Sequence, residues 1–136
     1  MKKILLLTVL LFVLQSCKKE TTESNELSTT NEATFFESPV VIQFHSESRC
    51  VTCNKIEALT LETLKSHPDL EFKLVNVDDA KNEKIATAFE ATGTALYLYN
   101  PKTNAKLDLT DFAFMNAGDE EKFKLELNQK VNEFIQ

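Results

Sequence analysis

Several residue types are scarce in this sequence, and each shortage argues against a class of protein. The 136 residues include no tryptophan, two glycines, three prolines, three cysteines and two histidines. His45 and His67 alone offer few imidazole ligands for a metal, and no flavin or nicotinamide motif is present, so no resident cofactor is expected. Lys and Arg number 15 against 21 Asp and Glu, and the net charge of −6 argues against nucleic acid binding.

Long apolar runs are lacking as well. The apolar stretch at residues 4–14 is interrupted only by Thr8 and follows Lys2 and Lys3. As a helix it would span about 16 Å, roughly half the hydrocarbon thickness of a bilayer. The pattern therefore predicts an export signal over residues 1–16, and not a membrane-spanning helix.

The end of this segment, Leu14-Gln15-Ser16-Cys17, resembles the bacterial lipobox, from which only Gln15 departs. An ordinary secreted protein would need an Ala-x-Ala-like cleavage site, and none lies nearby. The resemblance implies lipid attachment at Cys17 and a place in the bacterial cell envelope, at the periplasmic face or the outer membrane.

Residues 17–37 are expected to form the lipidated cysteine and a flexible tether, and residues 38–136 one domain. The tether is polar until Phe35 and Phe36, which we assign to the edge of the domain. With so little to bury, it cannot offset its ordering entropy. About 100 residues remain, enough for one core but not two. A monomer is expected.

The most informative feature is the pair Cys50 and Cys53, separated by Val51 and Thr52. At this spacing two sulfurs can close a tight disulfide across the first turn of a helix, and the helix amino terminus stabilises a thiolate. With Cys17 committed to lipid and the chain in an oxidising compartment, these two cysteines can pair only with each other. The pattern predicts a redox site.

Hydrophobic periodicity predicts the order strand, helix, strand, helix, strand, strand, helix. The expected positions are strands at 40–44, 70–77 and 94–99, helices at 50–66 and 81–90, a hairpin strand around Leu107 and Leu109, and a terminal helix from 118–121 onward. On the first helix one face is expected to be buried, with Cys53, Ile56, Leu59, Thr60, Thr63 and Leu64. A crossover helix between parallel strands and an antiparallel hairpin at the edge predict an α/β fold with a mixed central sheet.

This β-α-β-α-β-β-α order resembles the minimal thioredoxin-like fold. The resemblance is carried by residues 42–44 leading to Cys50-x-x-Cys53-Asn54-Lys55, and by residues 74–78 and 93–99. It implies that Cys50 attacks a partner disulfide, that Cys53 resolves the mixed disulfide, and that the partner is a protein thiol or disulfide or a membrane electron donor.

A narrower resemblance concerns Phe44-His45 followed by Arg49-Cys50-Val51-Thr52-Cys53. The pattern is similar to a thioredoxin-like group catalogued as the ArsF-type subunit of nitrophenyl-compound nitroreductase. That name implies an accessory role in reductive chemistry.

Three positions depart from ordinary thioredoxins. Arg49 stands in place of the aromatic residue before the first cysteine, Gln43 in place of the buried acid, and Ala95 in place of the cis-proline facing the disulfide. Arg49 adds positive charge beside Cys50, so the pKa of Cys50 is expected below the free value of about 8.5. At Ala95 a trans peptide is expected, and partner choice changes.

Gln43 cannot accept a proton, so the resolving thiol would depend on water, Glu47 or His45. The alternative is that Glu47 and His45 are solvated loop residues. Asp78 and Asp79 could suggest acid-base catalysis, but capping of the next helix explains them more simply. Tyr97 and Tyr99 are expected to be sheet side chains with hydroxyls near solvent.

Two other functions are open from the sequence. The two thiolates could carry copper(I), arsenic(III) or zinc, with His45 as a third ligand, whereas His67 lies about 21 Å away along the helix. Alternatively, the domain could be a non-catalytic adaptor subunit of a reductase that keeps the fold only for docking.

Overall fold

The computed structural model describes residues 35–136, which belong to one compact unit. The expected export signal, Cys17 and nearly all of the expected tether lie outside the described residues. Within residues 35–136 no helix is both long and apolar enough to cross a bilayer.

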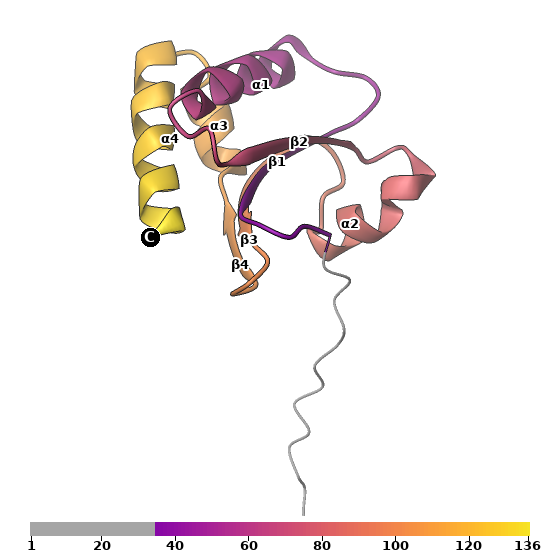
Figure 1. Cartoon of the computed structure of the whole chain (residues 1–136). Helices are drawn as coiled ribbons and strands as arrows, with labels where there is room; N and C mark the ends of the chain where they lie inside the picture. Colours follow the sequence, from indigo (N-terminus) through magenta and orange to yellow (C-terminus); the bar gives the residue numbers. More distant parts are fainter. Residues whose placement is uncertain (1–34) are drawn as a thin grey trace, which may run out of the picture. The chain divides into compact units, whose positions relative to one another are not determined.

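One four-stranded mixed sheet forms the centre of the domain, in the order β2-β1-β3-β4 (Figure 1). β1 pairs in parallel with β2 and antiparallel with β3, and β4 closes an antiparallel hairpin with β3. The bounds are β1 Val40–His45, β2 Glu71–Asn76, β3 Ala95–Asn100 and β4 Ala105–Asp108. The predicted α/β fold with a mixed sheet is confirmed.

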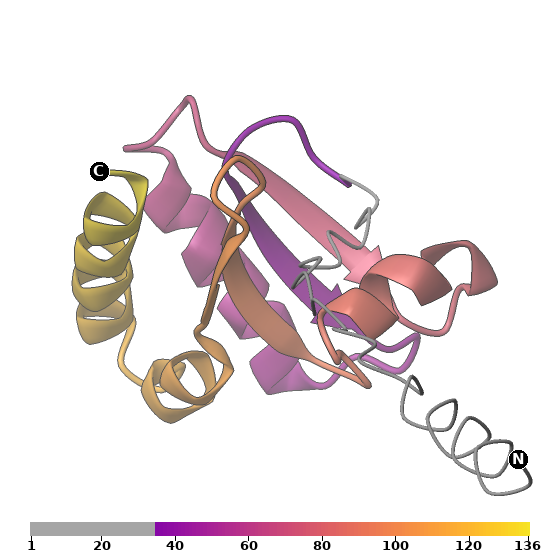
Figure 2. The same ribbon diagram turned by 90° about the horizontal axis from the view of Figure 1, so that it is seen from below.

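Helices cover both faces of this sheet (Figures 1 and 2). α1 (Val51–Leu64), the crossover between the parallel strands, packs with α3 (Thr110–Asn116) and α4 (Glu120–Ile135) on one face. The 3₁₀ turn η1 (Ala80–Asn82) and α2 (Glu83–Ala88) lie toward the other.

The alternation along β1 separates two cores, because successive side chains of a strand point to opposite faces. Val41 packs with α1, α3 and α4, whereas Val40, Ile42 and Phe44 pack on the α2 side. Gln43 shares the face of Val41. The sequence therefore places a polar side chain beneath the first turn of α1.

Most predicted elements are confirmed within a few residues. The six residues expected on the buried face of the first helix are the six that α1 buries. The helix expected at residues 81–90 is split into η1 and α2. Phe35 and Phe36 pack against the α2-side core, as expected for the edge of the domain.

Two expectations need correction. Leu109, expected in the hairpin strand, instead precedes α3, a helix that the sequence did not predict. The buried positions here are Leu109, Ala113, Asn116 and Ala117. Two alanines give too weak an apolar pattern to indicate a helix. Tyr99 is also more buried than expected: it packs in the core, with its hydroxyl hydrogen-bonded to Asn104.

Candidate functional site

The two cysteines form a disulfide at the amino terminus of α1, as predicted. Cys50 is the N-cap and is exposed, whereas Cys53 lies in the first turn and is only 5% exposed. The backbone N–H of Cys53 donates to Cys50 Sγ at 3.1 Å. The helix start therefore aims a donor at the sulfur that solvent can reach, an arrangement that stabilises a thiolate there.

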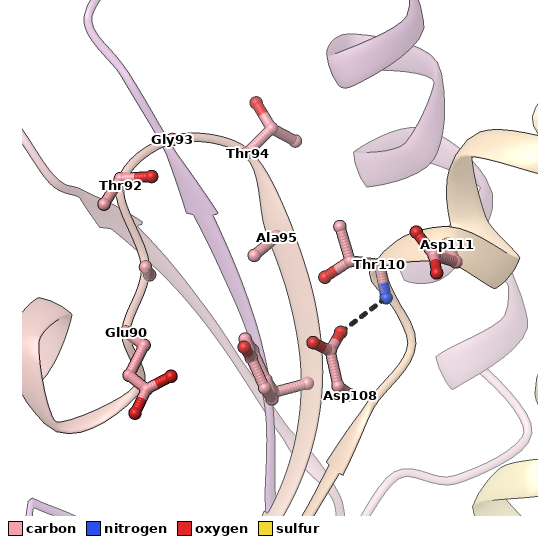
Figure 3. A pocket seen from close by; sticks show the side chains of 10 residues that line it. Glu90, Thr92, Gly93, Thr94, Ala95, Asp108, Thr110 and Asp111 are labelled. Atoms are coloured by element: carbon pink, nitrogen blue, oxygen red, sulfur yellow. Dashed lines mark hydrogen bonds between the residues drawn. The ribbon is translucent and has the colours of Figure 1, made fainter.

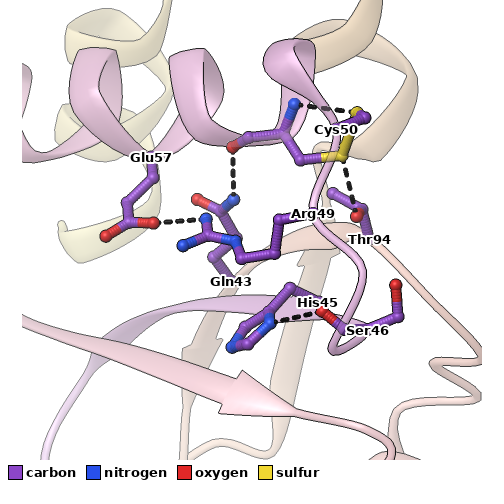
Figure 4. A network of polar contacts seen from close by, with 8 residues as sticks. Gln43, His45, Ser46, Arg49, Cys50, Glu57 and Thr94 are labelled. Carbon is purple, nitrogen blue, oxygen red and sulfur yellow. Dashed lines mark hydrogen bonds and ion pairs between the residues drawn. A yellow bond between two sulfur atoms is a disulfide. The ribbon is translucent and has the colours of Figure 1, made fainter.

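Gln43 supports this first turn from the sheet. Its side chain is fully buried, and Nε2 donates to the carbonyl oxygen of Cys53 at 3.0 Å (Figure 4). Oε1 has no hydrogen-bond partner among the described residues. Gln43 thus fixes the backbone of Cys53 to β1, and an amide offers no group that can take a proton from the Cys53 thiol.

Thr94 contacts the disulfide from the bend before β3. Its hydroxyl donates to Cys53 Sγ at 3.2 Å (Figure 4). The next residue, Ala95, pairs with Phe44 across β1, and no peptide bond in residues 35–136 is cis, so the expected trans bond at Thr94-Ala95 is confirmed. Thr94 was not predicted from the sequence as a site residue. Its position next to Ala95 was the available signal.

Arg49 does not stand free beside Cys50. Its guanidinium forms an ion pair with the carboxylate of Glu57 on α1, and in Figure 4 the side chain runs away from the disulfide toward that residue. Both side chains are 23% exposed. The negative charge of Glu57 therefore opposes part of the positive charge that Arg49 was expected to place beside Cys50.

His45 and Glu47 lie near the site but make no hydrogen bond to either cysteine within the described chain. His45 Nδ1 donates to the carbonyl of Ser46 at 2.8 Å (Figure 4). The backbone N–H of Glu47 donates to Asp78 at 2.7 Å. These contacts favour the interpretation of His45 and Glu47 as loop residues.

The two neighbouring aspartates do not converge on one site. Asp78 accepts the bond from the Glu47 backbone, while Asp79 caps η1 by accepting from the backbone N–H of Lys81. Hydrogen bonds from the side chain and then the backbone of Lys81 lower the pKa of the Asp79 carboxyl. The capping interpretation is confirmed for Asp79.

A pocket of about 460 Å³ opens beside the Thr94-Ala95 segment (Figure 3). It therefore shares Thr94 with the disulfide site. The lining includes Tyr97 and no basic residue. Three carboxylates and three threonine hydroxyl groups also line the pocket: Glu90, Asp108, Asp111, Thr92, Thr94 and Thr110. The pocket lining thus carries negative charge and meets the disulfide site at Thr94.

The unpredicted helix α3 builds one wall of this pocket. Asp108 accepts from the backbone N–H of Thr110 at 2.8 Å, and Thr110 Oγ1 accepts from that of Leu96 at 3.2 Å. Tyr97, the cross-strand partner of Asp108, donates to the carbonyl of Phe89. Burial, with the charge of Asp108 adding to it, raises the pKa of Tyr97 to about 12, so its hydroxyl stays neutral at physiological pH.

Within residues 35–136 no group of three or more His, Cys, Asp or Glu side chains is arranged to hold a metal ion. His45, the expected third ligand of a carrier, is engaged with Ser46, and His67 Nε2 is hydrogen-bonded to Asn128 on α4. The described residues thus offer the two sulfurs without a third ligand placed beside them.

Comparison with known proteins supports the fold. No family model and no curated protein matches the sequence. Among solved structures, oxidised thioredoxin O2 from Arabidopsis thaliana is similar over 73% of this chain and 76% of its own, with a TM-score of 0.51 and 16% identity. The fold is therefore thioredoxin-like.

Two further structures match over a smaller share of this chain. Fasciola hepatica thioredoxin is 24% identical over 52% of this chain and 64% of its own, and Chlamydomonas reinhardtii thioredoxin f2 is 20% identical over 62% and 82%. Both have a TM-score of 0.42. The narrower resemblance to the ArsF-type group stays a prediction, because no family model matches.

Proposed function

We propose that this protein exchanges thiols and disulfides with a partner, or passes electrons to it, through the Cys50–Cys53 pair. One observation carries the proposal: the disulfide lies at the start of α1 with Cys50 exposed, Cys53 buried and a backbone N–H directed at Cys50 Sγ. An accessible sulfur with a stabilised thiolate can attack, and a shielded sulfur one turn away can resolve.

In the reducing direction the Cys50 thiolate attacks one sulfur of the partner disulfide, and the other partner sulfur leaves as a thiolate. Cys53 then loses its proton to water and attacks Cys50 Sγ, which forms the Cys50–Cys53 bond and releases the second partner thiolate. Two electrons pass to the partner in total. The reverse sequence oxidises a partner dithiol.

Thr94 and Gln43 have different roles in this cycle. The Thr94 hydroxyl, donating to Cys53 Sγ, stabilises negative charge on the resolving sulfur. Gln43 holds the Cys53 backbone but accepts no proton, so the rate of resolution follows the availability of solvent base.

The sequence ahead of the domain supports a proposal for location. The export signal and the lipobox-like segment favour lipid attachment at Cys17 and a cell-envelope site. There the partner would be an exported protein thiol or disulfide or a membrane electron donor, and the accessory role implied by the ArsF-type resemblance fits such a donor.

The proposed function is tested by equilibrating the chain in buffers with a graded ratio of reduced to oxidised glutathione. A Cys17→Ser background is used so that only two thiols react. After alkylation with iodoacetamide, intact mass should show one reversible transition between a chain with no label and a chain with two labels. An absence of any reversible transition would contradict the proposal. A metal-sized mass excess that survives the reductant would favour the carrier function.

The acidic pocket predicts charge selectivity toward small disulfides. Cystamine and dithiodipropionate have similar size and opposite charge, and the reduced protein should favour cystamine by about threefold to tenfold at low ionic strength. The preference should shrink in high salt, because screening shortens the reach of the Glu90, Asp108 and Asp111 charges. The rates are measured by stopped-flow exchange under matched conditions.

The control for selectivity is a Glu90→Gln/Asp111→Asn variant, which removes two charges and leaves the Asp108 hydrogen bond to Thr110 in place. Its ratio of cystamine to dithiodipropionate rates should be lower than that of the native protein, because only Asp108 of the three pocket carboxylates remains. An equal ratio for variant and native protein would show that the pocket carboxylates do not act on the reaction.

A further inference from the structure

The ion pair between Arg49 and Glu57 links the loop before the disulfide to the body of α1. Arg49 immediately precedes Cys50, and Glu57 lies one turn beyond Cys53 on the same side of the helix. The pair involves Arg49 Nη2, while the buried Nε atom has no hydrogen-bond partner among the described residues. Within the described chain, Glu57 is thus the acidic group that holds this guanidinium.

The position of this pair determines how much positive charge reaches the sulfurs. An unpaired guanidinium beside Cys50 would stabilise its thiolate, and with 23% exposure its field would be only partly screened. Glu57 opposes that field and directs the guanidinium toward the second turn of α1. Figure 4 shows the Arg49 side chain extending from the disulfide to Glu57.

We propose that Glu57 is a positioning residue that holds Arg49 away from Cys50 and thereby keeps the Cys50–Cys53 pair more reducing than the Arg-Cys-x-Thr-Cys sequence alone implies. The inference rests on the proposed function, since it concerns the poise of the same disulfide. It assigns a role to a residue that the motif does not contain.

The direction of the effect follows from the exchange with glutathione. Two glutathione thiols reduce the protein disulfide: the Cys50–Cys53 bond breaks, one glutathione disulfide bond forms, and two electrons move to the protein sulfurs. The two glutathione protons pass to the protein thiols or, where Cys50 ionises, to solvent. Whatever stabilises the Cys50 thiolate stabilises the reduced protein and shifts this equilibrium toward it.

The central experiment measures this equilibrium constant for Glu57→Gln, whose side chain matches glutamate in size. With Arg49 freed from its partner, the equilibrium constant for reduction of the disulfide should rise by about threefold to tenfold. A tenfold change corresponds to about 30 mV for this two-electron couple. Arg49→Met should change the constant in the opposite direction. Both variants are first checked by circular dichroism and thermal unfolding for an unchanged fold.

A double variant separates positioning from the direct field of the Glu57 charge. If Glu57 acts by holding Arg49, then Glu57→Gln should raise the constant less than twofold in the Arg49→Met background. An equal rise in both backgrounds would overturn the positioning role, and so would an unchanged constant in the single variant.

The matched control is Glu62→Gln, on the same helix. Glu62 pairs with Lys124 of α4 and its side chain is 52% exposed. Its loss should leave the constant within 1.5-fold (about 0.2 kcal/mol) of the native value. A native protein with no reversible glutathione couple would contradict the proposed function itself. A normal native couple that Glu57→Gln leaves unchanged would contradict only the role of Glu57.

Discussion

The Cys53→Ser variant is expected to accumulate as a mixed disulfide, with turnover of a disulfide substrate reduced by roughly a thousandfold or more. Cys50 is exposed and keeps its attacking role, whereas a serine hydroxyl at position 53 cannot displace the partner from Cys50 Sγ. Incubating the reduced variant, in the Cys17→Ser background used for all these variants, with oxidised glutathione and measuring intact mass should show one bound glutathione per chain, removable by dithiothreitol.

Cys50→Ser and Thr52→Ser serve as controls for this trap. Cys50→Ser should lose both capture and turnover, because the remaining thiol of Cys53 is buried at 5% exposure. Thr52→Ser, between the two cysteines, should retain turnover and accumulate no mixed disulfide, because Cys53 is still present to resolve it. Capture by Cys50→Ser but not by Cys53→Ser would reverse the assigned roles of attacking and resolving sulfur.

Phe44→Ala is expected to lower the free energy of unfolding by about 3–5 kcal/mol. The Phe44 side chain is fully buried on the α2 side of β1, and its ring centroid lies 5.4 Å from that of Phe89 and 5.9 Å from that of Tyr97. Truncation removes the apolar burial and leaves a cavity among these rings. The loss is measured by urea unfolding of the oxidised protein.

This loss would be a large part of the total stability of a domain of this size, which is typically about 5–15 kcal/mol. Leu125→Ala on α4 is the control, since Leu125 is 73% exposed and its truncation should change stability by no more than about 0.5 kcal/mol. A change below about 1 kcal/mol for Phe44→Ala would show that the α2-side core tolerates the cavity by collapsing.

The elements with strong periodicity were predictable from the sequence. α1 carries apolar or small groups at helical spacing, which placed Cys53, Ile56 and Leu59 on its buried face. The strands follow from apolar runs such as residues 40–44. α3 was missed because it is a short helix whose buried residues, Ala113 and Asn116, have little apolar character.

The candidate site was predictable where the motif itself defines it. Cys50 and Cys53 follow from their spacing, and the position of Ala95 follows from the resemblance to thioredoxins. The contacts of Thr94 and Glu57 do not, because they depend on the path of the bend before β3 and of the loop before α1. A local pattern does not encode the direction in which Arg49 turns.

The described chain begins at the end of β1 that is far from the sulfurs. Phe36 packs against Tyr99 near that end, with ring centroids 6.1 Å apart, whereas the loop to Cys50 leaves from His45 at the other end. Six residues of strand span roughly 20 Å. The start of β1, beside the Phe36–Tyr99 ring contact, and the loop that leads to the disulfide therefore lie at opposite ends of the same buried strand.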